Sequence, residues 1–272
     1  YDAKKFRLGQ KAFYNNVFTM MIAKLAGLIS LLAIPSILDV LMFTKQSGTP
    51  CTAFRRYAAT ILHTFIWYEK VPDKETEFFA SLNNVRKKHC VASKRSFQAG
   101  LNRISQLDMA LTQFGFIGFT LLCGDDLGVS ASEEDIEGLV HVWRVIGSML
   151  GMEERFNICA GSVEETKALC ARLLDEIFLP YFTARNPDFE KMRDILLDGI
   201  WPINPQIDPA AFTAITYRLA TLGTSNNNHS LAIGEFSALR FSIFLTEHWP
   251  FLAYWTFGKQ RSQVNIYKIH LE

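Results

Sequence analysis

The chain has 272 residues, of which 49% are hydrophobic and 22 are phenylalanine, so it is long enough for one large domain with a deep core. Its formal net charge is +1 and no basic run is interleaved with aromatic residues, which argues against nucleic acid as a partner. The five cysteines form no C-x-x-C pair, so we expect small buried residues in a reducing, intracellular compartment rather than a disulfide framework or a zinc site.

The first long apolar stretch, residues 17–43, raises the question of a membrane span. A spanning helix needs about 20 apolar residues, whereas Lys24, Pro35 and Asp39 interrupt this stretch. We therefore expect a buried core helix here. The aromatic residues of 241–257 are consistent either with a cap on the core or with peripheral association with a membrane.

Most later segments have the spacing of amphipathic helices, beginning with residues 53–67 and 76–93. Three capping patterns, each a serine followed three residues later by an acidic residue, predict where the next helices begin. These serines are Ser105, Ser132 and Ser162.

Glycine and proline predict where those three helices end. We expect the first to end at Gly124, the second at Gly151 and the third before Pro180. Two more helices are expected over residues 209–223 and 231–246, and no run alternates with a period of two. The sequence therefore predicts an all-α, single multi-helix globular domain over residues 1–272.

One of the six histidines, His89, follows the cationic run Arg86-Lys87-Lys88 on an expected helix. A haem needs an imidazole presented from a rigid helix into an apolar slot, with basic groups nearby for the propionates. A histidine beside charged residues is also common on ordinary solvated surfaces. The local pattern alone therefore leaves both interpretations of His89 open.

Four segments in fixed order favour the haem interpretation. They are Arg55-Arg-Tyr-Ala-Ala-Thr60, Val85-Arg-Lys-Lys-His89, Ile104-Ser-Gln-Leu-Asp-Met-Ala110 and His141-Val-Trp-Arg-Val-Ile-Gly147. Together they resemble the family that contains the latex-clearing rubber oxygenases and the fungal ER-bound oxygenase of mycophenolic acid biosynthesis. The resemblance covers about residues 53–159.

The resemblance implies a b-type haem buried between helices, dioxygen as co-substrate, and location at the endoplasmic reticulum or another membrane. His89 takes the position of the axial iron ligand, with Arg86 on the same helix. Arg56 and Thr60 take positions on the opposite, substrate-facing side and are the expected catalytic residues. Arg144, among apolar neighbours, is expected either to extend its charged end to solvent or to pair with a carboxylate or a haem propionate, and it is a third cofactor-binding candidate.

The sequence departs from the family pattern where Ala59 replaces a lysine that can serve as the sixth iron ligand. The closed state that such a lysine provides is therefore not expected here. His63 lies one helical turn beyond Ala59 and is a second candidate iron ligand. The family's acidic base has no secure match, and Asp39 is the candidate, unless it ends the apolar helix instead.

These features predict a haem-dependent oxygenase that acts on an apolar, isoprenoid- or lipid-like substrate, with cleavage of a carbon–carbon double bond as one outcome. One alternative keeps the haem without oxygenation, as in a dehydratase, an isomerase or a sensor. Another is a helical lipid-binding or membrane-associated protein with no cofactor. The sequence leaves the oligomeric state undetermined.

Overall fold

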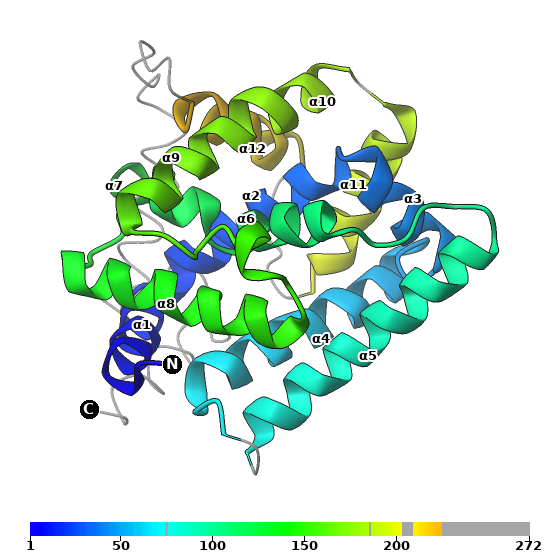
Figure 1. The fold of residues 1–272 in the computed structure, drawn as a ribbon. Coiled ribbons are helices and arrows are strands. Elements are labelled where there is room, and N and C mark those ends of the chain that lie inside the picture. The colour runs from blue at the N-terminus through cyan, green and yellow to red at the C-terminus, as the bar shows by residue number, and fades with distance from the viewer. Residues whose placement is uncertain (74–75, 185, 203–208, 225–272) are drawn as a thin grey trace.

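Helices form the framework of the part of the chain that the computed structural model describes, residues 1–73, 76–184, 186–202 and 209–224 (Figure 1). No strand occurs in these residues, which confirms the all-α class. The α-helices are α1 (Ala3–Asn15), α2 (Val17–Leu32), α3 (Pro35–Phe43), α4 (Pro50–Glu69), α5 (Glu77–Gln98), α6 (Gln106–Leu122), α7 (Gly124–Leu127), α8 (Glu133–Leu150), α9 (Val163–Leu173), α10 (Leu179–Thr183), α11 (Pro187–Ile200) and α12 (Pro209–Leu222). A 3-10 turn (Glu154–Phe156) follows α8, and a π-helical segment (Leu174–Phe178) joins α9 to α10.

Two helix crossings are made backbone to backbone at glycines. Helix α2 crosses α6 where a Cβ atom on Gly27 would lie 2.1 Å from the carbonyl oxygen of Gly115. Helix α1 crosses α8 in the same way, since a Cβ atom on Gly9 would lie 2.3 Å from the carbonyl oxygen of Gly138. Helices α4 and α5 run side by side as a long antiparallel pair that closes another side of the core (Figure 1).

The apolar stretch 17–43 forms two helices rather than one. Helix α2 ends at Leu32, and Pro35 begins α3, where the missing N–H of proline costs no helical hydrogen bond. Most residues of α2 are buried, which confirms the expected core helix. Asp39 lies in the middle of α3, so it does not end the apolar helix.

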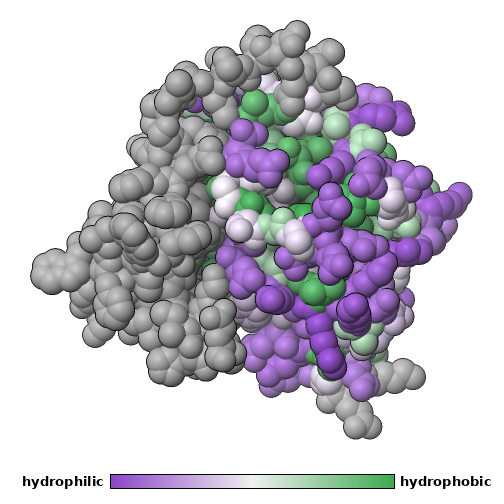
Figure 2. Space-filling model, turned by 90° about the vertical axis from the view of Figure 1, so that its left-hand side faces the viewer, coloured by the Kyte–Doolittle hydropathy of each residue, from purple (hydrophilic) through white to green (hydrophobic). Residues whose placement is uncertain are grey.

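By length and composition, no single helix among the described residues could cross a membrane. Helices α1 and α2 pass that test only as a pair, and they meet at a bend of 92°. The expected helix 231–246 and the aromatic residues of 241–257 lie outside the described residues. Figure 2 shows one face of the molecule, whose described part is mostly hydrophilic, with hydrophobic residues visible between hydrophilic ones.

The three capping patterns begin helices α6, α8 and α9, as predicted. In each, the serine oxygen accepts a hydrogen bond from the backbone N–H three residues later, and the acidic side chain at that position bonds back to the serine N–H. Gly151 ends α8 with a φ of +99°, in the left-handed region.

The first of these helices ends close to the expected position, because α6 ends at Leu122 and its C-cap is Cys123. The expected left-handed cap is wrong, since Gly124 begins the short α7 and Gly128 takes that conformation with a φ of +86°. Pro180 does not stop the third helix, because the wider π-helical turn directly before it lets the helical path continue to Thr183.

The cysteines divide into two groups. Cys123, Cys159 and Cys170 are buried, as expected of small apolar residues. The expectation is wrong for Cys51 and Cys90, which are exposed because they lie on the outer faces of α4 and α5.

Candidate functional site

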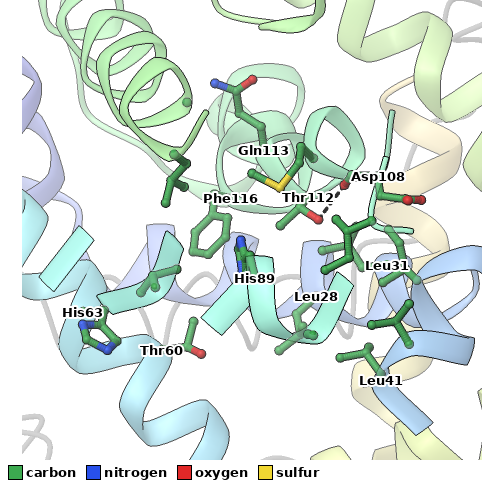
Figure 3. Close-up of a pocket in the computed structure, with 18 of the residues that line it drawn as sticks. Leu28, Leu31, Leu41, Thr60, His63, His89, Asp108, Thr112, Gln113 and Phe116 are labelled. Carbon is green, nitrogen blue, oxygen red and sulfur yellow. Dashed lines mark hydrogen bonds between the residues drawn. The ribbon is translucent and has the colours of Figure 1, made fainter. Parts of the chain in front are cut away.

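A cavity of about 240 Å³ lies between α2, α3, α4, α5, α6 and α8. Its walls are mainly aliphatic and aromatic (Figure 3). The apolar lining residues include Leu28, Leu31, Ile37, Val40, Leu41, Val85, Met109, Phe116, Trp143, Ile146 and Leu150. A cavity with this lining favours a hydrocarbon or another apolar group.

His89 projects from α5 into this lining, between Phe116 and Thr112 of α6 and Thr60 of α4 in the view of Figure 3. Its Nδ1 atom is buried and has no hydrogen-bond partner among the described residues. Burial lowers the pKa of His89 below its usual value, and the nearby cation of Arg56 lowers it further. The ring is therefore neutral at neutral pH, which is the form that binds a metal.

Arg56 and Thr60 lie one turn apart on α4, and both line the cavity. The Thr60 hydroxyl donates a hydrogen bond of 3.0 Å to the Arg56 carbonyl oxygen, so the proton of that hydroxyl is already engaged. The guanidinium of Arg56 forms no ion pair with any residue that the structure describes. Burial lowers the Arg56 pKa, although an arginine remains charged at any physiological pH.

His63 also lines the cavity, but its ring is anchored to the protein. Its Nδ1 atom lies 2.7 Å from the Ser81 hydroxyl oxygen, which also accepts a hydrogen bond of 3.0 Å from Nε1 of Trp67. Figure 3 shows His63 at one end of the lining, away from the centre where His89 lies. His63 and His89 thus belong to the same cavity but enter it from different helices, α4 and α5.

The structure does not bring the other three candidate residues into the cavity. Asp39 is exposed on α3. Arg86 is also exposed, and its guanidinium lies beside Gly151 at the end of α8. Arg144 is exposed on α8 and pairs with the carboxylate of Glu154.

The acidic side chain that lines the described part of the cavity is Asp108, which the sequence suggested as a helix cap or as a partner of an arginine such as Arg103 or Arg144. One of its carboxylate oxygens accepts a hydrogen bond of 2.6 Å from the Ser36 hydroxyl, and the other accepts bonds from the N–H and hydroxyl of Ser105. Asp108 therefore joins α3 to the start of α6 beside the cavity. A capping motif carries no signal for this second contact, because Ser36 is 72 residues away.

A second residue that sequence reasoning missed is Lys24, a buried cation behind the cavity wall. Its Nζ donates to the Thr64 hydroxyl and lies 4.8 Å from the ring centroid of Phe116, which lines the cavity. No carboxylate of the described residues pairs with it, and burial lowers its pKa from 10.5 to about 7. Its position on a core helix was visible in the sequence, but its burial depends on how α2 packs against α4 and α6.

The buried amine makes folding stability depend on pH. The Lys24 pKa is about 7 in the folded state and 10.5 in its usual environment, so between these values the unfolded state binds more protons and stability rises with pH. Below pH 7 both states are charged and the full cost of burial is present. We expect Lys24→Met to raise the free energy of unfolding by about 2 kcal/mol at pH 6.

The stabilisation by Lys24→Met should shrink as the pH rises from 7 toward 10. Over this range the buried wild-type amine is deprotonated, and its burial lowers the free energy of unfolding less and less as the pH rises. Urea unfolding at several pH values measures it. Lys45→Met is a suitable control, because Lys45 is exposed and should give no such trend. A constant difference between Lys24→Met and wild type across the pH range would contradict the assignment.

The donor set limits what kind of metal group these residues could hold. Among the described residues, no group of three or more histidine, cysteine, aspartate or glutamate side chains is placed to hold a metal ion. A haem supplies four nitrogen donors itself and needs one axial imidazole from the protein. A neutral His89 with an unpartnered Nδ1 in an apolar cavity, near the cation of Arg56, fits that requirement.

Comparison with protein families places the chain in one of them. A model of the family described as "ER-bound oxygenase mpaB/B'/Rubber oxygenase, catalytic domain" matches residues 12–224. The matched region begins within α1, ends just beyond α12 and includes every residue that lines the cavity. No curated protein and no solved structure matches the chain.

Proposed function

The chain belongs to the family of ER-bound oxygenase and rubber oxygenase catalytic domains, and from this premise we propose that it is a haem-dependent oxygenase acting on an apolar, isoprenoid- or lipid-like substrate. The observation that carries the proposal is the position of His89, a neutral imidazole in the wall of a mainly apolar cavity with an unpartnered buried nitrogen. Oxygenation is the class of reaction that the family name describes.

In this proposal His89 of α5 would hold haem b. The bound haem would activate dioxygen for insertion into the substrate, with cleavage of a carbon–carbon double bond as one outcome. The protein contributes the environment. The apolar walls exclude water, and burial of a hydrocarbon chain against them stabilises the complex by about 0.8 kcal/mol per CH₂ group.

Arg56 and Thr60 supply the polar contacts on the α4 side of the cavity. The Thr60 oxygen can accept a hydrogen bond, because its own proton goes to the Arg56 carbonyl. The Arg56 guanidinium can donate hydrogen bonds to an oxygen atom of a ligand, because no described residue occupies its donors. Asp108 is held by Ser36 and Ser105, and in this arrangement it fixes the cavity wall.

Absorption spectra of the purified protein, oxidised, reduced and with carbon monoxide, test the haem. We expect a Soret band that shifts on reduction and on addition of carbon monoxide. A colourless, iron-free protein that still binds lipids would instead favour the cofactor-free alternative. Turnover of an isoprenoid substrate with and without oxygen tests the reaction, since a haem-dependent dehydratase or isomerase would continue under anaerobic conditions and an oxygenase would stop.

A further inference from the structure

Arg56 is a cation without a counter-ion in a mainly apolar cavity. It lines the cavity and makes no ion pair with any described residue. A partly buried charge is costly unless it is paired, and arginine cannot escape the cost by losing its proton. An anion from outside the chain would remove this cost.

Asp108 is a carboxylate of the same cavity, but it is not the counter-ion of Arg56. Its two oxygens accept hydrogen bonds from Ser36 and Ser105, and it forms no ion pair with Arg56. His89, the other titratable group close to Arg56, is an imidazole, which is either neutral or positively charged and so cannot serve as a counter-ion. The negative partner of Arg56 is therefore missing from the described part of the cavity.

A second unused donor lies next to Arg56. The side chain of Tyr57 is buried and lines the cavity, and its hydroxyl has no hydrogen-bond partner of normal geometry among the described residues. The Ser47 hydroxyl lies close enough to influence it, but it is likewise left without such a partner. Burial raises the pKa of Tyr57, so the phenol stays protonated and remains a donor.

We propose that Arg56 and Tyr57 bind the carboxylate of an amphipathic acid whose hydrocarbon chain lies along the apolar walls of the cavity. A planar guanidinium matches the two oxygens of a carboxylate, and the phenol adds a third donor. Leu28, Leu31 and Phe116 provide the surface for the chain. This inference rests on the proposed function, because it takes the same cavity as the substrate site and names the polar end of the substrate.

A matched pair of ligands tests the carboxylate. Dodecanoic acid and dodecanol have the same chain, so their affinities differ through the head group. We expect wild-type protein to bind the acid about 10- to 100-fold more tightly than the alcohol, in line with the strength of charge-assisted hydrogen bonds. Isothermal titration calorimetry measures both affinities, on protein with and without bound haem.

Variants then identify the residues. Arg56→Met should bring the ratio of the two affinities close to one, and Tyr57→Phe should lower it about threefold. Arg55→Met is the matched control, because Arg55 precedes Arg56 on α4 but is exposed, and it should keep the full preference. If Arg56→Met does not fold by circular dichroism, Arg56→Lys keeps the charge without the planar fork and should retain only part of the preference.

The carboxylate that Arg56 binds could belong to an amphipathic acid or to a haem propionate. The haem content of the variants distinguishes these two sources. Equal binding of acid and alcohol by the wild type, with or without haem, overturns the proposal. If Arg56→Met also lowers the haem content in that case, the carboxylate belongs to the propionate. An acid preference that Arg56→Met abolishes, in protein that never binds haem, supports the inference while the proposed oxygenase function fails.

Discussion

Replacement of His89 by alanine is expected to abolish haem binding and with it oxygenase activity. In the proposed function no described residue takes over as the axial ligand, because His63 is bonded to Ser81 and lies at one end of the cavity lining. Residues that only orient a ligand are worth about 10–100-fold in metal affinity, so loss of the ligand itself should lower haem affinity by more than about 100-fold. Haem titration followed at the Soret band gives the affinity directly.

Two histidine variants control for this result. His141→Ala removes a half-buried ring that does not line the cavity and whose Nε2 accepts a hydrogen bond from the backbone N–H of Asp2. His63→Ala removes a ring within the lining that already has a protein partner. Both should keep their haem, with the second showing at most a small spectral shift. A normal Soret band in His89→Ala together with a lost band in His63→Ala would move the axial ligand to α4.

The second large effect is expected at the crossing of α2 and α6. In Gly27→Val, a side chain would have to fit where even its Cβ atom would lie 2.1 Å from the Gly115 carbonyl oxygen. Rotation of a side chain cannot relieve this contact, because the Cβ position of Gly27 and the Gly115 carbonyl are both fixed by the backbone. The two helices must therefore separate. We expect the free energy of unfolding to fall by more than about 3 kcal/mol, at the upper end of the cost of overpacking.

Gly48→Ala provides the matched comparison for this effect. An added Cβ atom at Gly48 meets nothing within 4 Å, and its φ is not positive, so the substitution should be neutral or slightly stabilising. Urea unfolding of both variants measures the difference. A Gly27→Val protein as stable as Gly48→Ala would show that the close approach of α2 and α6 is not required for folding.

The helix starts were predictable because they depend on residues three apart in the sequence. The capping boxes at Ser105, Ser132 and Ser162 are local, and all three begin helices where expected. The helix ends were less predictable. Whether Gly124 or Gly128 takes the left-handed conformation, and whether Pro180 stops a helix, depends on the path that the following segment must take.

The candidate site was predictable in part for a similar reason. His89, Arg56, Thr60 and His63 all line the cavity, and they lie on two helices whose spacing the sequence shows. Asp39 and Arg144 are charged residues with apolar neighbours, a pattern that does not say which way the side chain points. Asp108 and Lys24 acquire their roles from contacts with distant helices, so no local pattern could reveal them.

At the crossing of α2 and α6, the spacing of the helices and the shape of the cavity depend on different residues. In many proteins the same side chains determine both. Gly27 and Gly115 set the distance between α2 and α6, whereas Leu28, Leu31 and Phe116 on the same helices line the space beside it. A change at one of these larger residues can lengthen or widen that space while the helix axes stay where the glycines hold them. Preference for ligands of different chain length can therefore evolve on this scaffold at little expense to its architecture.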